Sequence, residues 1–101
     1  MEREDFIKRL TELRMNKGVS AREMSLAIGQ SEGYINNVEN GVNFPSMTVF
    51  FYICEYLDIT PMEFFDTSVK NPTKSKELLD VTKNLSNEQL EHLIAIAKGL
   101  K

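Results

Sequence analysis

The side chains that most often carry out covalent chemistry are scarce in this chain. Its 101 residues include a single cysteine, Cys54, and a single histidine, His92. One cysteine cannot form an internal disulfide, and the two residues together cannot supply the ligand set of a metal site. No nucleophile is placed beside a general base, and no glycine-rich loop is suited to cradle a phosphate. We therefore expect a protein that is not an enzyme and that holds no metal and no cofactor.

Residues suited to recognition gather instead between Ser20 and Gly41, in the sequence SAREMSLAIGQSEGYINNVENG. Two short helical patterns lie on either side of Gly29. The first begins with a capping box formed by Ser20 and Glu23, and Ser31 is expected to cap the second. Two helices joined by a short turn that contains glycine are typical of proteins that place the second helix in the DNA major groove. The segment therefore favours DNA recognition over catalysis.

The elements that must hold this segment in place are all predicted to be helices. Nowhere do polar and apolar residues alternate with period two, and apolar residues recur at helical spacing. The first helix is expected over about residues 5–16, with Asp5 as its cap. Ser46 is expected to cap a fourth helix that ends near residue 57, and Thr60-Pro61-Met62-Glu63 is typical of a helix start. The residues expected in the core include Phe6, Leu10, Leu13, Met24, Ala27, Ile28, Ile35, Val38 and Cys54.

A different organisation is predicted after residue 66. Residues 67–74 contain turn-forming residues and read as a linker. Beyond them, one helix is expected over about residues 75–83, and a capping box from Ser86 to Gln89 opens another. The sequence thus predicts an all-α protein with a domain over 1–66, a linker over 67–74 and a helical extension over 75–101.

The last predicted helix carries an apolar stripe that needs a partner surface. Packing on the chain's own fifth helix is one possibility, and pairing with the same helix of a second chain is the other. We favour a homodimer, because a two-fold axis would present two recognition helices to DNA. The stripe consists of Leu90, Leu93, Ile94, Ala97 and Leu100.

The charge of the chain is unusual for a protein that binds DNA. The net charge is −3, and residues 1–66 carry six Lys or Arg side chains against eleven Asp or Glu side chains. Because DNA affinity comes largely from phosphate neutralisation, a single acidic domain would bind weakly, which again favours a dimer. The chain has no apolar run of about 20 residues and begins with the charged segment MEREDF, so we expect a cytoplasmic protein without a membrane span or signal peptide.

The run from Phe6 to Phe65 resembles the XRE family, the DNA-binding domains of lambda-repressor and Cro type. The resemblance covers about residues 5–66. It implies a five-helix lambda-repressor-like domain whose third helix, about residues 31–40, lies in the major groove. The matching segments are Leu13-Arg14, Gly18-Val19-Ser20, Glu23-Met24, Ile28-Gly29, Ser31, Tyr34-Ile35, Val38-Glu39-Asn40-Gly41, Pro45-Ser46 and Leu57-Asp58-Ile59-Thr60.

The resemblance also implies which residues meet DNA. Base contacts fall to Glu32, Gly33, Asn36 and Asn37. Asparagine can pair with adenine through two hydrogen bonds, so Asn36 or Asn37 is the better direct reader. The residues expected at the phosphate backbone are Arg22, Ser31, Tyr34, Asn40 and Asn43.

The resemblance assigns Arg14 and Glu39 a structural role. They match a buried ion pair that joins the first helix to the end of the third, and two solvated charges are the alternative. Three positions depart from the family pattern. Ala21 replaces a common glutamine, Ser25 replaces a small alanine, and Glu32 stands where a neutral polar residue is common.

Together these observations predict a transcriptional regulator that binds double-stranded DNA, most simply as a homodimeric repressor. The alternative is a protein-interaction module on the same fold, either an antitoxin or a protein that sequesters another regulator. The acidic balance, Glu32 and the surplus of aromatic residues motivate this alternative. The roughly 35 residues after the domain leave little room for a sensor domain, so no small-molecule ligand is expected.

Overall fold

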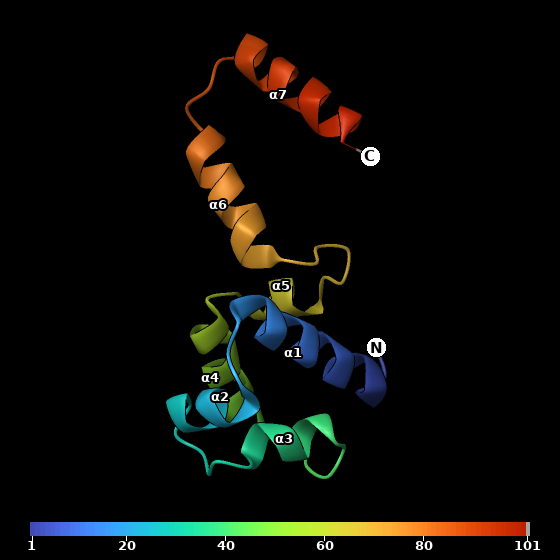
Figure 1. Ribbon diagram of the computed structural model, residues 1–101, viewed down its shortest axis with the longest axis vertical. Coiled ribbons are helices and arrows are strands. Elements are labelled where there is room, and N and C mark those ends of the chain that lie inside the picture. Colours follow the sequence, from blue (N-terminus) through green and yellow to red (C-terminus); the bar gives the residue numbers. More distant parts are fainter. Residues whose placement is uncertain (101) are drawn as a thin grey trace.

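The computed structural model describes residues 1–100, and every regular element in that range is a helix (Figure 1). The predicted all-α class is therefore confirmed. Lys101, the last residue of the predicted extension, lies outside the described residues. The helices are α1 (Arg3–Lys17), α2 (Ala21–Ala27), α3 (Tyr34–Glu39), α4 (Met47–Leu57), α5 (Pro61–Phe65), α6 (Pro72–Thr82) and α7 (Asn87–Gly99).

The first five helices pack around one apolar core. Three aromatic rings lie at its centre, with centroid distances of 4.9 Å between Phe6 and Phe64, 5.1 Å between Phe50 and Phe64, and 5.9 Å between Phe6 and Phe50. Each fully buried aromatic or aliphatic side chain stabilises the fold by about 1.5–3 kcal/mol. The other buried apolar residues are Leu10, Leu13, Met24, Ile28, Ile35, Val38, Ile53, Cys54, Leu57 and Ile59.

Local capping signals located several helix ends correctly. The hydroxyl of Ser46 accepts from the Val49 amide at 3.2 Å. Both hydrogen bonds of the predicted capping box at Thr60 are formed. The Glu63 amide donates to the Thr60 hydroxyl at 3.1 Å, and the Thr60 amide donates to the Glu63 carboxylate at 2.9 Å. Gly41 ends α3 in the left-handed region at φ 76°, where a side chain would be strained. These motifs act within four or five residues, which is why the sequence alone predicts them.

Other helix starts differ from the prediction. Asp5 does not cap α1, which starts earlier, and its carboxylate accepts from the Glu2 amide at 2.8 Å. Ser31 does not cap α3 through its side chain. Its carbonyl accepts from the Tyr34 amide at 3.0 Å, which makes a turn of residues 31–33 and delays the helix to Tyr34. Gly33 favours that delay because glycine costs about 1 kcal/mol inside a helix.

Two more expectations near helix ends were wrong in part. At α2, Ser20 accepts from the Glu23 amide at 3.0 Å, but the return bond of the predicted capping box is not formed among the described residues. The helix expected over 75–83 begins at Pro72, after Asn71, whose side chain accepts from the Lys74 amide at 3.3 Å. Proline fits this first position because it lacks the amide hydrogen that a helix start leaves unpaired.

Arg9 joins α1 to the end of α5, a role that the sequence did not predict. Its side chain is buried, and its guanidinium donates to the carbonyls of Phe64 at 2.6 Å, Glu63 at 2.8 Å and Asp66 at 2.9 Å. The last carbonyls of a helix have no partners within it and carry a partial negative charge. The buried arginine therefore provides hydrogen-bond donors to the carbonyls at the C-terminal end of α5 and holds that short helix against the core.

Ser25 joins α2 to α3, and it is this residue rather than Ala27 that lies in the core. Ala27 was expected to be buried and is exposed, whereas Ser25 is fully buried. Its hydroxyl donates to the Ala21 carbonyl at 2.7 Å and accepts from the Ile35 amide at 2.9 Å. Ile35 is the second residue of α3, so this amide has no partner inside the helix. Ser25 thus provides from α2 the cap that α3 lacks at its own start.

The C-terminal helices extend away from the five-helix domain. The molecule measures 50 × 23 × 22 Å, and α6 and α7 occupy the end opposite α3 (Figure 1). Helix α6 meets the domain near the ends of α1 and α4, where the Asn16 amide donates to the Lys70 carbonyl at 2.8 Å. Helix α7 has no fully buried side chain, Leu90 and Leu93 of its apolar stripe are half-buried, and the helix lies apart from α5 (Figure 1). None of the helices in residues 1–100 has the length and apolar character to cross a membrane.

The Ser25 bridge generates the first testable prediction. Ser25→Ala leaves the buried Ile35 amide without its acceptor, which should lower the free energy of unfolding by about 1–3 kcal/mol. Urea denaturation followed by circular dichroism measures this change. Ser31→Ala is the matched control, because that exposed hydroxyl makes no hydrogen bond among the described residues. Equal midpoints for Ser25→Ala and the parent protein would contradict the role given to this bridge.

Candidate nucleic-acid interface

Helix α3 presents one face to the core and the other to solvent. Ile35 and Val38 are fully buried, while Asn36 and Asn37 between them are exposed. Neither asparagine side chain makes a hydrogen bond within residues 1–100, so both amide groups are available to an external partner. A short helix with buried anchors and free amides on its outer face has the form needed to read base edges in a groove.

The four base-contact candidates divide into two pairs. Asn36 and Asn37 lie on α3, whereas Glu32 and Gly33 lie in the turn that precedes it. Glu32 is exposed and Gly33 is half-buried. The expected recognition helix is therefore shorter than residues 31–40, and the turn carries half of the candidate contacts.

The backbone-contact candidates flank this helix on both sides. Ser31 is exposed before α3, and Tyr34 is half-buried against the core at its start, where burial raises the pKa of its phenol. Asn40 follows the helix, and the loop after it turns back toward α3. The backbone amides of Val42 and Asn43 donate to the Asn37 carbonyl at 2.9 Å and 3.4 Å. An exposed hydroxyl before α3 and exposed amide side chains after it can position a nucleic acid without reading its sequence.

One ion pair connects a predicted backbone contact with a predicted base contact. Arg22 on α2 lies 3.3 Å from the Glu32 carboxylate, and both side chains are largely exposed. An exposed pair of this kind contributes under about 1 kcal/mol to stability. The pair places the guanidinium of Arg22 beside the turn that precedes α3.

The predicted pair of Arg14 and Glu39 is formed in the structure. The Arg14 Nε and Nη2 donate to the two carboxylate oxygens of Glu39 at 2.8 Å and 3.0 Å, and Nη1 donates to the Val19 carbonyl at 2.9 Å. The side chains retain 16% and 13% of their exposure, so they are not two solvated charges. The hydrogen bond to Glu39 raises the pKa of Arg14. This planar pair fixes the last residue of α3 to α1.

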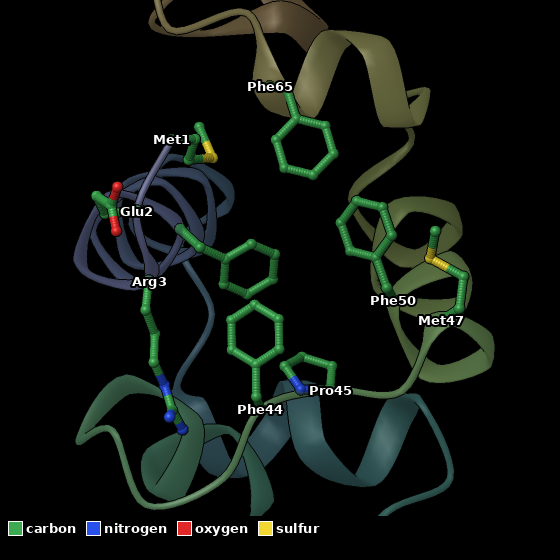
Figure 2. Close-up of a pocket in the computed structure, with 9 residues that line it drawn as sticks. Met1, Glu2, Arg3, Phe44, Pro45, Met47, Phe50 and Phe65 are labelled. Atoms are coloured by element: carbon green, nitrogen blue, oxygen red, sulfur yellow. The ribbon is translucent and has the colours of Figure 1, made fainter.

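A second surface is aromatic and lies beside the loop after α3. Phe44, Phe50 and Phe65 point toward one hollow of about 570 Å³, which Met47 and Pro45 also line (Figure 2). Phe50 and Phe64 are buried, whereas Phe51 and Phe65 remain 46% and 47% exposed. A contiguous apolar surface of this kind is typical of protein interfaces.

The cysteine and the histidine are not gathered into a reactive centre. Cys54 is buried in α4, and burial raises the pKa of its thiol to about 11, which keeps it protonated at neutral pH. His92 is exposed on α7. Within residues 1–100, no group of His, Cys, Asp and Glu side chains is arranged to hold a metal ion.

Comparisons with a protein-family model and with solved structures identify the fold and the family of this chain. The family model described as helix-turn-helix matches residues 10–64. The crystal structure of the restriction-modification controller protein C.AhdI from Aeromonas hydrophila is 34% identical, with a TM-score of 0.56 over 60% of this chain and 88% of that chain. A chain of the SinR protein/SinI protein complex is 18% identical, with a TM-score of 0.59 over 92% of this chain and 94% of that chain, and supports the fold alone. No curated protein matches the chain.

Proposed function

This chain belongs to the XRE family of helix-turn-helix proteins and is a DNA-binding transcription regulator, and from that premise we propose that it acts as a repressor. In this proposal α3 enters the major groove of double-stranded DNA, and a homodimer covers two half-sites. The protein carries out no catalytic step. Repression follows from occupation of a promoter.

The observation that carries the proposal is the pair of free amides on α3. Asn36 and Asn37 are exposed, lack partners within the described residues, and project from a helix whose other face is buried. An asparagine amide can donate to N7 and accept from N6 of adenine at the same time, which discriminates against other bases by about 1–3 kcal/mol. Asn40 and Asn43 extend the same polar surface toward the phosphates.

The homodimer follows from charge and from uncovered apolar surface. Residues 1–66 carry eleven acidic and six basic side chains, so one domain supplies few phosphate contacts. Helix α7 exposes a stripe in which Ile94 is 52% and Leu100 is 82% accessible. Pairing of two such stripes buries them and links two domains. A two-fold operator would then hold its half-sites about 34 Å apart, one helical turn.

A second candidate function has its own observation in favour. The aromatic hollow beside Phe44 and Phe65 offers an apolar surface, and none of its aromatic residues is among the proposed DNA contacts. A regulator-sequestering protein or an antitoxin would use such a surface to bind another protein. The acidic charge and Glu32 would then reduce competition from DNA, because like charges repel phosphates.

Binding to DNA at two salt concentrations separates the two functions. We expect the full chain to bind a duplex carrying its own promoter region with a Kd in the nanomolar range, and to bind more tightly as salt is lowered. Fluorescence anisotropy at about 50 mM and 200 mM salt measures both properties. Absence of binding even at the lower salt would refute the repressor and leave the protein-interaction module.

The base readers can be tested separately from affinity. Asn36→Ala and Asn37→Ala should lose preference for the selected sequence by about 1–3 kcal/mol while keeping their affinity for random DNA. Selection of bound sites from a random DNA pool, followed by titration of one selected and one scrambled duplex, measures this difference. If the ratio of the two affinities stays at its original value in both variants, these residues do not read the bases.

The dimer interface predicts a change in molecular mass. Leu93→Glu combined with Ile94→Glu places two charges on the α7 stripe, and burying either charge at an interface is unfavourable. Light scattering should report a dimer for the parent protein and a monomer for the variant. Glu91→Gln with His92→Gln is the control, because those exposed polar residues lie outside the stripe. A variant mass equal to that of the parent dimer would exclude α7 as the interface.

A further inference from the structure

The positive charges of the five-helix domain are nearly all engaged within the protein. Arg9 is buried against the end of α5, Arg14 is paired with Glu39, and Arg22 is paired with Glu32. Lys17 lies 4.9 Å from the Tyr56 ring at the C-terminal end of α1. The other two cations in residues 1–66 are Arg3, which contacts the Gly41 carbonyl and the Phe44 ring, and Lys8; neither forms an ion pair among the described residues.

Both remaining cations lie beside the end of α3. A hollow of about 590 Å³ separates the first turns of α1 from the residues that close α3. Arg3 and Lys8 line it from α1, and Asn40 and Gly41 line it from the other side. The remaining lining residues are Glu4, Ile7 and Glu39, of which Glu39 is neutralised by Arg14.

Arg3 is held toward the loop that follows α3. Its Nη2 donates to the Gly41 carbonyl at 3.3 Å, and its guanidinium carbon lies 5.4 Å from the centroid of the Phe44 ring. Figure 2 shows the side chain leaving α1 in the direction of this loop. The loop from Gly41 to Pro45 contains no lysine or arginine of its own. Arg3 therefore brings a positive charge to a segment that lacks one.

We propose that this hollow is a binding site for one phosphate of the DNA backbone, with Arg3 as its principal ligand and Lys8 and Asn40 beside it. The inference rests on the proposed DNA binding and adds an anchor for the C-terminal end of α3. Arginine has five donors in a planar fork, and the structure uses one of them on Gly41, so the others can bind two phosphate oxygens. Glu4 opposes binding, because its carboxylate repels the phosphate.

The phosphate site predicts a change in the salt dependence of DNA binding. Arg3→Gln keeps an amide that can donate to Gly41 and removes the charge. For a random-sequence duplex of about 30 base pairs, its affinity at low salt should fall about three- to tenfold, and the slope of log K against log salt should become shallower by about 0.9. Fluorescence anisotropy across a salt series measures both quantities.

Three further variants separate charge at this site from other effects. Lys76→Gln removes the same charge from α6, which lies on the side of the five-helix domain opposite α3 (Figure 1), and should leave affinity and slope unchanged. Arg3→Lys should keep the slope, and Glu4→Gln should raise the affinity. If the parent protein binds the duplex and Arg3→Gln shows the same affinity and the same slope of log K against log salt, the phosphate site is refuted while DNA binding stands. Failure of the parent protein to bind would refute both.

Discussion

The position of α3 depends on the ion pair between Arg14 and Glu39. Helix α3 spans only Tyr34–Glu39, and a helix of six residues is not stable by its own hydrogen bonds. The bidentate pair holds its last residue to α1, and the Ser25 hydroxyl holds the amide of its second residue to α2. Ile35 and Val38 fill the space between these two anchors. Both ends of α3 are held by other helices. The exposed asparagines therefore keep a defined position even though α3 is too short to be stable alone.

The contacts that hold the fold together also engage part of the positive charge of an acidic domain. Two of its arginines serve the fold, because a guanidinium can satisfy several carbonyls or a carboxylate at once, as Arg9 and Arg14 do. Few cations remain for phosphates, and Arg22 is tied to Glu32. Low charge per domain fits with our proposals that binding requires two copies and that Arg3 supplies an additional anchor. Affinity would then come from symmetry and placement rather than from a broad basic face.

The apolar stripe on α7 and the aromatic hollow are both uncovered within residues 1–100. The stripe on α7 lies at one end of the 50 Å molecule, and the aromatic hollow beside Phe44 lies near the end of α3. Exposed apolar surface is costly in water, and contiguous apolar surfaces are typical of protein interfaces. Their separation along the molecule means that association through α7 leaves the aromatic hollow available.

The features that could be foreseen from the residues are those with local causes. Capping at Ser46, Thr60 and Ser86, the glycine that ends α3, and the spacing of Phe6, Leu10 and Leu13 all act within one or two helical turns. The family resemblance added one distant contact, between Arg14 and Glu39. Arg9, Ser25 and Arg3 were missed, because their partners are determined by which backbone atoms of separate helices come within about 3 Å, and no periodicity encodes that distance. Ala27 was misplaced for a related reason, since α2 turns Ser25 toward the Ile35 amide and leaves Ala27 in solvent. Sequence patterns therefore specified the helices and their order, whereas packing between helices specified which polar side chains build the fold and which remain free to bind.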